Sequence, residues 1–320
     1  HERGLFLIVD EAHGAHFSFG DGYFPESALQ CGADLVIQSL HKTLPSFTQT
    51  AILHVKGKLV DQDRISRYLS MFQTSSPSYL FMAGMERCIR YMDGDGRNEM
   101  IRYEKRLERF MERMEVLQVL EILDREICGK YRTVAGWDPS KIVVSTMRAE
   151  DFHGEELAET LRRKYHLEME MTAPEYVIAM TSLMDTEEGF ERLGTALLEI
   201  DGALRRRMES GRKEKAASET PEGLESKLSH PVRRMLICEA MDADTERTAF
   251  QDTVGKVSAE FVYLYPPGIP IIAPGEVFTD AIVEKIMAYK AAGLLVQGPA
   301  DPDADVILTC QTPGFVHKGC

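Results

Sequence analysis

The chain has 320 residues, of which 44% are hydrophobic and 28% charged, as expected of a globular protein with two or three domains. Its formal net charge of −14 argues against a surface for nucleic acid or anionic membranes, which would need a basic patch. No apolar stretch approaches the ~20 residues that cross a bilayer, and no signal-peptide pattern is present. The six cysteines form no CxxC pair, which predicts neither a zinc site nor a disulfide framework and favours reduced thiols in a cytoplasm.

The strongest local signal lies at residues 35–55, LVIQSLHKTLPSFTQTAILHV. An apolar run at 35–37 leads to Lys42 and a polar loop, and a second apolar run covers 51–55. This pattern predicts a buried strand that delivers a lysine to a loop, followed by another strand. Desolvation there would lower the pKa of the amine and free it for Schiff-base chemistry. The competing interpretation is a surface lysine beyond a strand end, since lysines are mostly exposed.

A carboxylate precedes this lysine at the end of another predicted strand. Residues 5–9, LFLIV, form a continuous apolar run that is typical of a strand buried on both faces, and the run ends at Asp10. The tips of two parallel strands face one crevice at the carboxyl edge of a sheet. Pyridoxal phosphate (PLP) requires both groups, because a lysine binds its aldehyde as an imine and a carboxylate keeps its pyridine nitrogen protonated.

These two motifs, VDEAHGAHF and SLHKTLPSFTQTAILHV, resemble those of the PLP-dependent ornithine/lysine/arginine decarboxylase family, which has the aspartate-aminotransferase fold (fold type I). A third stretch, YPPGIPIIAPGE at 265–276, is similar to the signature of that family's carboxy-terminal domain. The resemblance covers nearly the whole chain and is weaker between about 95 and 225. Family members carry a long preceding stretch with the phosphate cup and a ring-stacking aromatic, so we expect this chain to be amino-terminally truncated.

The resemblance implies an α/β protein with three domains. The expected parts are the carboxy-terminal part of a PLP-binding large domain with a mostly parallel sheet at 1–95, a small α/β domain at 96–208, and a carboxy-terminal α+β decarboxylase domain at 231–320. Residues 209–230 are polar and lack periodicity, which predicts a linker. Periodicity predicts helices at 59–72, 79–92, 97–126, 154–165, 186–208 and 279–291, and further strands at 141–146, 167–171, 177–181 and 269–272.

The resemblance also assigns roles around the cofactor. Lys42 is the Schiff-base lysine, Asp10 pairs with the ring nitrogen, and the methyl group of Ala12 packs under the ring. Ser39 contacts the phosphate and His41 also lies at the cofactor. The alternative for Ser39 is a cap at the strand end.

Three further candidates lie outside the core of the two motifs. His13, like its neighbour His16, either hydrogen-bonds near the cofactor or satisfies loop carbonyls. Thr74, with Ser75, either supplies hydroxyls to the phosphate of a neighbouring subunit's cofactor or belongs to an ordinary turn. Glu276 either receives the distal cation of a basic substrate or is a surface residue after a Pro-Gly turn.

The function implied is decarboxylation of arginine, lysine or ornithine to the corresponding amine, feeding polyamine synthesis in the cytoplasm. The implied assembly is a homodimer or higher homo-oligomer whose subunits complete each other's sites, with PLP as cofactor and no metal. One alternative is an aminotransferase of the same fold, with Arg132 or Arg148 binding the substrate carboxylate. The other is a non-catalytic chain that acts only in oligomerisation.

Overall fold

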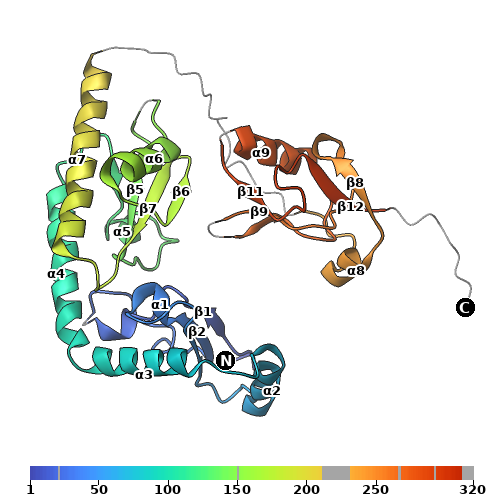
Figure 1. Cartoon of the computed structure of the whole chain (residues 1–320), viewed down its shortest axis with the longest axis horizontal. Coiled ribbons are helices and arrows are strands. Elements are labelled where there is room, and N and C mark those ends of the chain that lie inside the picture. The colour runs from blue at the N-terminus through green and yellow to red at the C-terminus, as the bar shows by residue number, and fades with distance from the viewer. Residues whose placement is uncertain (21, 150, 211–230, 266–267, 292, 312–320) are drawn as a thin grey trace, which may run out of the picture. The chain divides into compact units, whose positions relative to one another are not determined.

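The computed structural model describes the chain except for residues 21, 150, 211–230, 266–267, 292 and 312–320. The chain divides into two compact units, residues 1–212 and 213–320 (Figure 1). Most of the predicted linker, residues 211–230, lies outside the described residues. A further division of the first unit at residue 95 stays a prediction.

The first sheet of unit 1 carries the two recognised motifs. Its strand order is β1 (Ile8–Asp10), β2 (Leu35–Ser39), β3 (Ala51–Val55). Strands β1 and β2 are parallel, with Asp10 opposite Ile37, whereas β3 returns antiparallel to β2. The expectation of a mostly parallel sheet is therefore wrong for these three strands, because a short loop after β2 reverses the chain. Helix α1 (Leu40–Thr43) follows β2 without a gap.

The apolar run before β1 is not buried as its composition predicts. Leu5, Phe6, Leu7 and Ile8 are between 51% and 67% exposed, and β1 begins only at Ile8. The reason is its position: β1 lies at the edge of the sheet, and no described element covers these side chains.

Two capped helices follow this sheet. Helix α2 (Gln62–Phe72) begins where the side chain of Asp61 accepts a hydrogen bond from the Arg64 amide. Helix α3 (Tyr79–Asp93) begins in the same way, with Ser78 accepting from Phe81. Both caps satisfy amide groups that have no partner within the first turn of a helix.

Helix α4 (Gly96–Met114) is shorter than the predicted helix at 97–126. The buried carboxylate of Asp201 accepts hydrogen bonds from the backbone amides of residues 118, 119 and 120 and so holds this segment out of the helix. The chain then enters β4 (Glu121–Ile122), which pairs with the next strand. A tertiary contact thus ends a pattern that local periodicity would have continued.

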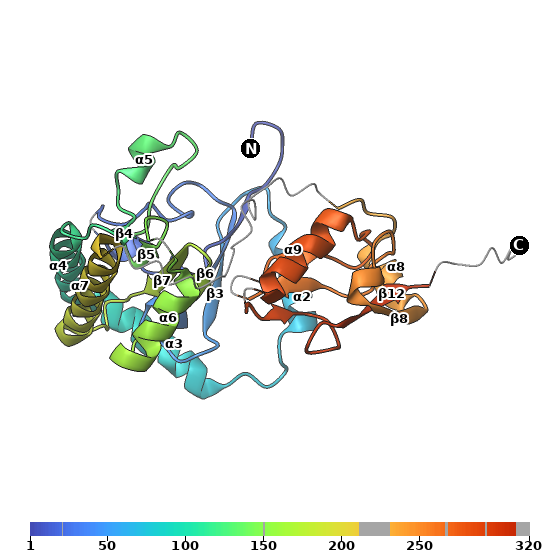
Figure 2. The same cartoon turned by 90° about the horizontal axis from the view of Figure 1, so that it is seen from above.

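The second sheet of unit 1 is antiparallel, in the order β4-β5-β7-β6. Its other strands are β5 (Lys141–Ser145), β6 (Met171–Ala173) and β7 (Tyr176–Met180), and the helices around it are α5 (Ile127–Lys130), α6 (Gly154–Tyr165) and α7 (Glu187–Glu209). The bounds predicted for the strand at 167–171 are wrong, because β6 begins only at Met171 and ends at Ala173, next to the tight turn that joins it to β7. Helix α6 packs against β6 and β7, while α4 and α7 lie side by side (Figure 2).

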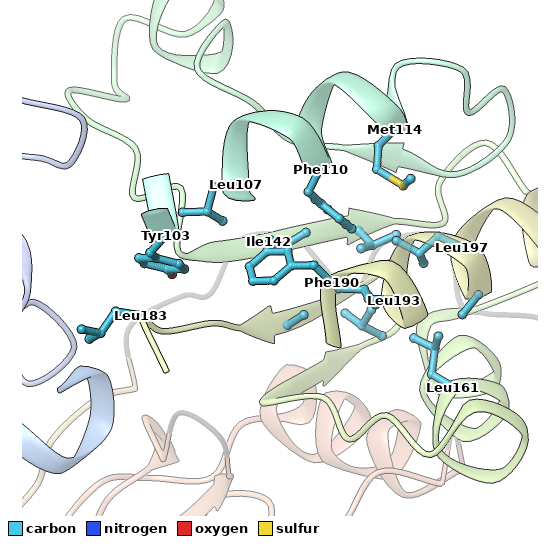
Figure 3. Close-up of a cluster of buried hydrophobic side chains, with 14 of the residues drawn as sticks. Tyr103, Leu107, Phe110, Met114, Ile142, Leu161, Leu183, Phe190, Leu193 and Leu197 are labelled. Atoms are coloured by element: carbon cyan, nitrogen blue, oxygen red, sulfur yellow. The ribbon is translucent and has the colours of Figure 1, made fainter. Parts of the chain in front are cut away.

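The core of unit 1 joins this second sheet to its helices. Figure 3 shows Tyr103, Leu107 and Phe110 of α4 facing Phe190 and Leu193 of α7, with Ile142 of β5 among them. The same buried cluster includes Leu40 of α1 and Ala15 and Phe24, which follow β1. The region after β1 is therefore anchored in the core of the second sheet.

Unit 2 has its own core, built around Phe250, Val262, Phe278 and Ile286. Its strands are β8 (Thr245–Ala249), β9 (Val262–Leu264), β10 (Pro270–Ile272), β11 (Val296–Gln297) and β12 (Val306–Cys310), and its helices are α8 (Ile237–Asp242) and α9 (Asp280–Ala291). Short 3-10 turns occur at Phe17–Phe19 in unit 1 and Phe250–Asp252 in unit 2. Within the described part of the chain, no helix has the length and apolar character needed to cross a bilayer.

Candidate active site

Lys42 lies one helical turn beyond β2 and is partly buried. Its Nζ atom is 3.1 Å from Nε2 of His13, in the loop that follows β1. The buried side chain of Leu40 anchors α1 in the core, and the Leu40 amide donates to the carbonyl of Thr50. The turn that carries the amine is thus held from both sides, and Lys42 contacts the loop after β1.

Asp10 ends the parallel neighbour of β2 and remains exposed. Its Oδ1 accepts a hydrogen bond from the amide of Ala12 at 3.0 Å, and the Ala12 carbonyl accepts one from the amide of Ser39 at 3.3 Å. These contacts carry the loop after β1 across the end of β2. Asp10 and Lys42 therefore lie at the same carboxyl edge of the sheet, as the parallel pairing requires.

Glu11, which the sequence did not single out, fixes this loop to its surroundings. Its carboxylate accepts hydrogen bonds from the Ser27 hydroxyl at 3.0 Å, the Ala28 amide at 2.7 Å and the Gln38 side chain at 2.5 Å. Gln38 in turn contacts Nε2 of His54 at 3.0 Å. The acidic residue next to Asp10 thus has a structural role, which leaves Asp10 as the accessible carboxylate.

His13 is held neutral at physiological pH. Its pKa is lowered from 6.5 to about 4, mainly by burial and in addition by the ammonium groups of Lys42 and Lys141, whose effect exceeds the opposing effect of Asp138 and Asp10. A neutral imidazole accepts a hydrogen bond from the Lys42 ammonium, and it does not add a second positive charge beside that amine.

A second group of charges lies behind His13 and was missed by sequence reasoning. Lys141, at the start of β5, donates to Asp138 at 2.8 Å, and Asp138 lies 3.6 Å from Nε2 of the buried His16. Burial lowers the pKa of His16, and although burial would raise the pKa of Asp138, the His16 ring and Lys141 hold it well below its usual range. No pattern in the sequence links these residues to the first motif, because the contact is purely tertiary.

The other residues expected at the cofactor lie around Lys42. Nδ1 of His41 is 3.0 Å from the carbonyl of Thr50, which fixes the imidazole beside the lysine turn. Ser39 precedes α1, and its side chain makes no capping hydrogen bond there. Ser39 is thus the N-cap residue of α1 by position, and its hydroxyl stays a candidate for an anion.

Thr74 and Glu276 each make a hydrogen bond within their own turn. Thr74 lies in the exposed turn between α2 and α3, and its hydroxyl accepts a hydrogen bond from the Ser76 amide at 3.3 Å. Glu276 belongs to unit 2, where its carboxylate accepts from the Ala273 amide at 2.8 Å and so closes the turn after β10. Both residues have a local structural role, and their roles toward cofactor and substrate stay predictions.

The groups gathered at the sheet edge fit PLP. Lys42 offers a partly buried amine beside a neutral imidazole, Asp10 offers an accessible carboxylate on the adjacent strand, and Ser39 offers a hydroxyl between them in sequence. An amine and a carboxylate are the groups that the aldehyde and the pyridine nitrogen of this cofactor need. In the described part of the chain, no cluster of His, Cys, Asp and Glu side chains is arranged to hold a metal ion.

Comparison with known proteins places the chain in a family. The profile described as Orn/Lys/Arg decarboxylase, major domain, matches residues 1–201, and the profile of the carboxy-terminal domain of the same family matches residues 233–293. The chain belongs to the Orn/Lys/Arg decarboxylase family.

Two curated relatives named arginine decarboxylase share about a third of their residues with the chain. That of Halalkalibacterium halodurans is 33% identical over 94% of this chain and 59% of its own length. That of Bacillus subtilis is 31% identical over 96% of this chain and 60% of its own length. The chain thus spans less than two thirds of the length of these curated relatives.

Solved structures show the same fold. The lysine decarboxylase of Francisella novicida superposes with a TM-score of 0.72 at 19% identity, over 95% of this chain and 53% of that chain. The constitutive lysine decarboxylase of Escherichia coli gives a TM-score of 0.72 at 17% identity, over 95% of this chain and 54% of that chain. These matches support a mixed α/β fold and, at this identity, show the fold alone.

Proposed function

We propose that the protein decarboxylates a basic amino acid to the corresponding amine with PLP as cofactor. The observation that carries this proposal is the placement of Lys42 and Asp10 at the carboxyl ends of two adjacent parallel strands. That arrangement provides an attachment point and a charge partner for one pyridine ring. Membership of the Orn/Lys/Arg decarboxylase family supports the reaction class.

When bound, PLP supplies an electron sink for the electrons that remain after the carboxylate departs as carbon dioxide. Lys42 would hold the cofactor through its amine, Asp10 would pair with the protonated ring nitrogen, and the small methyl group of Ala12 would leave room for the ring.

His13, being neutral, accepts a hydrogen bond from the Lys42 amine and so orients that amine. Ser39 offers a hydroxyl to the phosphate, and His41 lies beside the lysine. Thr74 is assigned to the phosphate of a neighbouring subunit's cofactor, which makes the active form a homodimer or higher homo-oligomer.

We place arginine first among the substrates to test, ahead of lysine and ornithine. The relatives of 31–33% identity are named arginine decarboxylase, whereas those named lysine decarboxylase are 22–24% identical. Glu276 is assigned to the distal cation of this substrate. A cytoplasmic role in supplying polyamine precursors goes with this assignment.

The aminotransferase alternative is less well supported. Such an enzyme needs an arginine that is available for the substrate carboxylate. Of the two candidates, Arg148 pairs with Glu121 at 3.0 Å, and Arg132 lies in an exposed segment. The non-catalytic alternative would require that Lys42 not bind the cofactor at all, which is directly testable.

The test combines attachment and turnover. After incubation with PLP and reduction with borohydride, peptide mapping is expected to find the cofactor on Lys42 in the native protein and in K58A, an exposed lysine control, but not in K42A. Turnover is tested on the full-length protein, since we expect this chain alone to be inactive; incubation with each basic amino acid in turn is expected to release carbon dioxide and the amine from the substrate. Formation of a keto acid without carbon dioxide would instead establish an aminotransferase, and labelling of a different lysine would remove the basis of the proposal.

A further inference from the structure

The contacts behind His13 form a continuous path from the core of unit 1 to the loop after β1. At its base, the buried hydroxyl of Tyr103 lies 2.7 Å from Oγ1 of Thr181. Thr181 donates to the carbonyl of Ser140 twice, from its amide at 2.9 Å and from its hydroxyl at 3.0 Å. The segment that precedes β5 is thus tied by hydrogen bonds to the end of β7 and, through Thr181, to Tyr103 of α4.

The ion pair between Lys141 and Asp138 in this segment contacts the loop after β1 at two residues, His13 and His16. The Nζ atom of Lys141 donates to Asp138 at 2.8 Å, to Ser140 at 2.6 Å and to the main-chain carbonyl of His13 at 3.4 Å. The other carboxylate oxygen of Asp138 lies 3.6 Å from the His16 ring. Asp138 and Lys141 are only 16% and 19% exposed, so solvent screens this pair far less than a surface pair.

The surroundings of the His16 ring indicate that its contact with Asp138 matters. It is 2% exposed, it packs edge-on against the rings of Phe17 and Phe24, and neither ring nitrogen has a hydrogen-bond partner within the described residues. A buried polar ring without such partners is costly. The attraction of the Asp138 carboxylate is the electrostatic contact that offsets part of this cost.

We propose that Asp138 and Lys141 are positioning residues that clamp the loop after β1 and thereby hold His13 against Lys42. The proposal rests on the proposed function for the importance of the Lys42 amine, but the clamp itself can be tested without cofactor or substrate. Neither residue reaches Lys42, so each acts through His13 and His16.

The decisive variant is D138N, because its two possible effects on His13 have opposite signs. The charges that face His13 are Lys42, Lys141, Asp138 and Asp10. If Asp138 acted only as a distant charge, its loss would lower the pKa of His13 below about 4. If Asp138 clamps the loop, its loss reduces the burial of His13, which is the largest cause of the low value, and the pKa rises.

NMR titration of the His13 ring in the 320-residue chain distinguishes these outcomes. We expect D138N to raise the pKa of His13 to about 5 or above, toward the ordinary value of histidine. K141R, which keeps the donors and the charge, is expected to leave it unchanged. A matched control is the exposed pair of the same spacing on α6, through E159Q and R162M, neither of which is expected to shift the His13 pKa. A fall or no change in D138N would overturn the proposal.

Amide hydrogen exchange provides an independent readout if D138N fails to fold. The loop is closed by amide hydrogen bonds from Gly14 to Glu11 and from Phe17 to Gly14. In K141M we expect these amides to exchange at least about 10-fold faster, while core amides of β5 and β7 keep their protection. Unchanged exchange in the loop would refute the clamp, whatever the result of the cofactor-attachment experiment on Lys42.

Discussion

The Nζ atom of Lys42 and the Nε2 atom of His13 lie 3.1 Å apart, although the two residues follow different strands of the sheet. The contact joins the only lysine of the second motif to a histidine of the first. Because the imidazole is neutral at pH 7, it contacts the amine as a hydrogen-bond acceptor and not as a competing cation. The chemistry proposed for Lys42 depends on this pairing.

The low pKa of His13 predicts a loss of stability in mild acid. The folded state holds His13 neutral down to about pH 4, whereas the unfolded chain protonates it near its ordinary pKa of 6.5, so the unfolded state binds more protons between these values. The contribution of His13 to the free energy of unfolding is therefore fully present above pH 6.5, and it is lost as the pH drops toward 4. After discounting for the partial exposure of His13, we expect a loss of about 1–2 kcal/mol.

Urea unfolding at pH 7.0, 5.5 and 4.5 measures this loss. In H13Q the titratable group is gone, so the decline between pH 6.5 and 4 should be shallower than in the native protein, with the contribution of His16 remaining. Identical pH profiles for the two proteins would contradict the assignment.

The Glu11 network predicts that this acid is needed for folding of the site. Replacement by alanine leaves the Ser27 hydroxyl, the Ala28 amide and the Gln38 side chain without their acceptor. We expect E11A to lower the free energy of unfolding by about 2–4 kcal/mol, whereas E2Q, at an exposed position, should be within about 0.5 kcal/mol of the native protein. Chemical denaturation of both variants provides the comparison, and equal effects would show that the network contributes nothing.

Asp201 offers a similar prediction for the core of the second sheet. In D201N a neutral amide oxygen replaces the charged acceptor of the backbone amides at residues 118, 119 and 120, and the amide nitrogen that replaces Oδ2 faces the Gln118 donor. A loss of about 2–3 kcal/mol in unfolding free energy is expected. D93N, which removes only an exposed ion pair to Arg97, serves as the control and should cost less than about 1 kcal/mol. A D201N protein as stable as D93N would refute this account of how α4 ends.

Glu276 allows its structural and proposed substrate roles to be separated. In E276Q the amide oxygen still accepts from the Ala273 amide, so the melting temperature should change little. If the carboxylate binds the distal cation of the substrate, KM for the basic amino acid should rise about 10-fold while kcat changes less. An unchanged KM would confine Glu276 to the turn after β10.

The sequence was informative wherever a local pattern coincided with the tertiary structure. Helices α3, α6, α7 and α9 lie within a residue or two of their predicted bounds, because capping residues and apolar periodicity agree there. The two motifs also placed Asp10 and Lys42 at strand ends, since continuous apolar runs that end in polar residues mark the edge of a sheet.

The errors arose where a distant residue decides the local structure. The carboxylate of Asp201 ends α4 well before the apolar stripe ends, and the position of the turn after β6 fixes the bounds of that strand. Composition alone also placed residues 5–9 in a buried strand, whereas burial depends on what covers them. Asp138 and Lys141 carry no local signal, because their contacts with His13 and His16 exist only after folding.

Helix α1 begins at the residue after β2 ends, so no spacer separates the sheet from the reactive amine. The direction of the Lys42 side chain is therefore set by the pleat of β2, in which neighbouring side chains point to opposite faces. Inserting or deleting a single residue within 35–39 would turn the lysine away from the first motif without altering any residue of either motif. If Lys42 binds the cofactor as proposed, the loops around β2 can differ in length, but the length of β2 is fixed by the direction in which Lys42 must point.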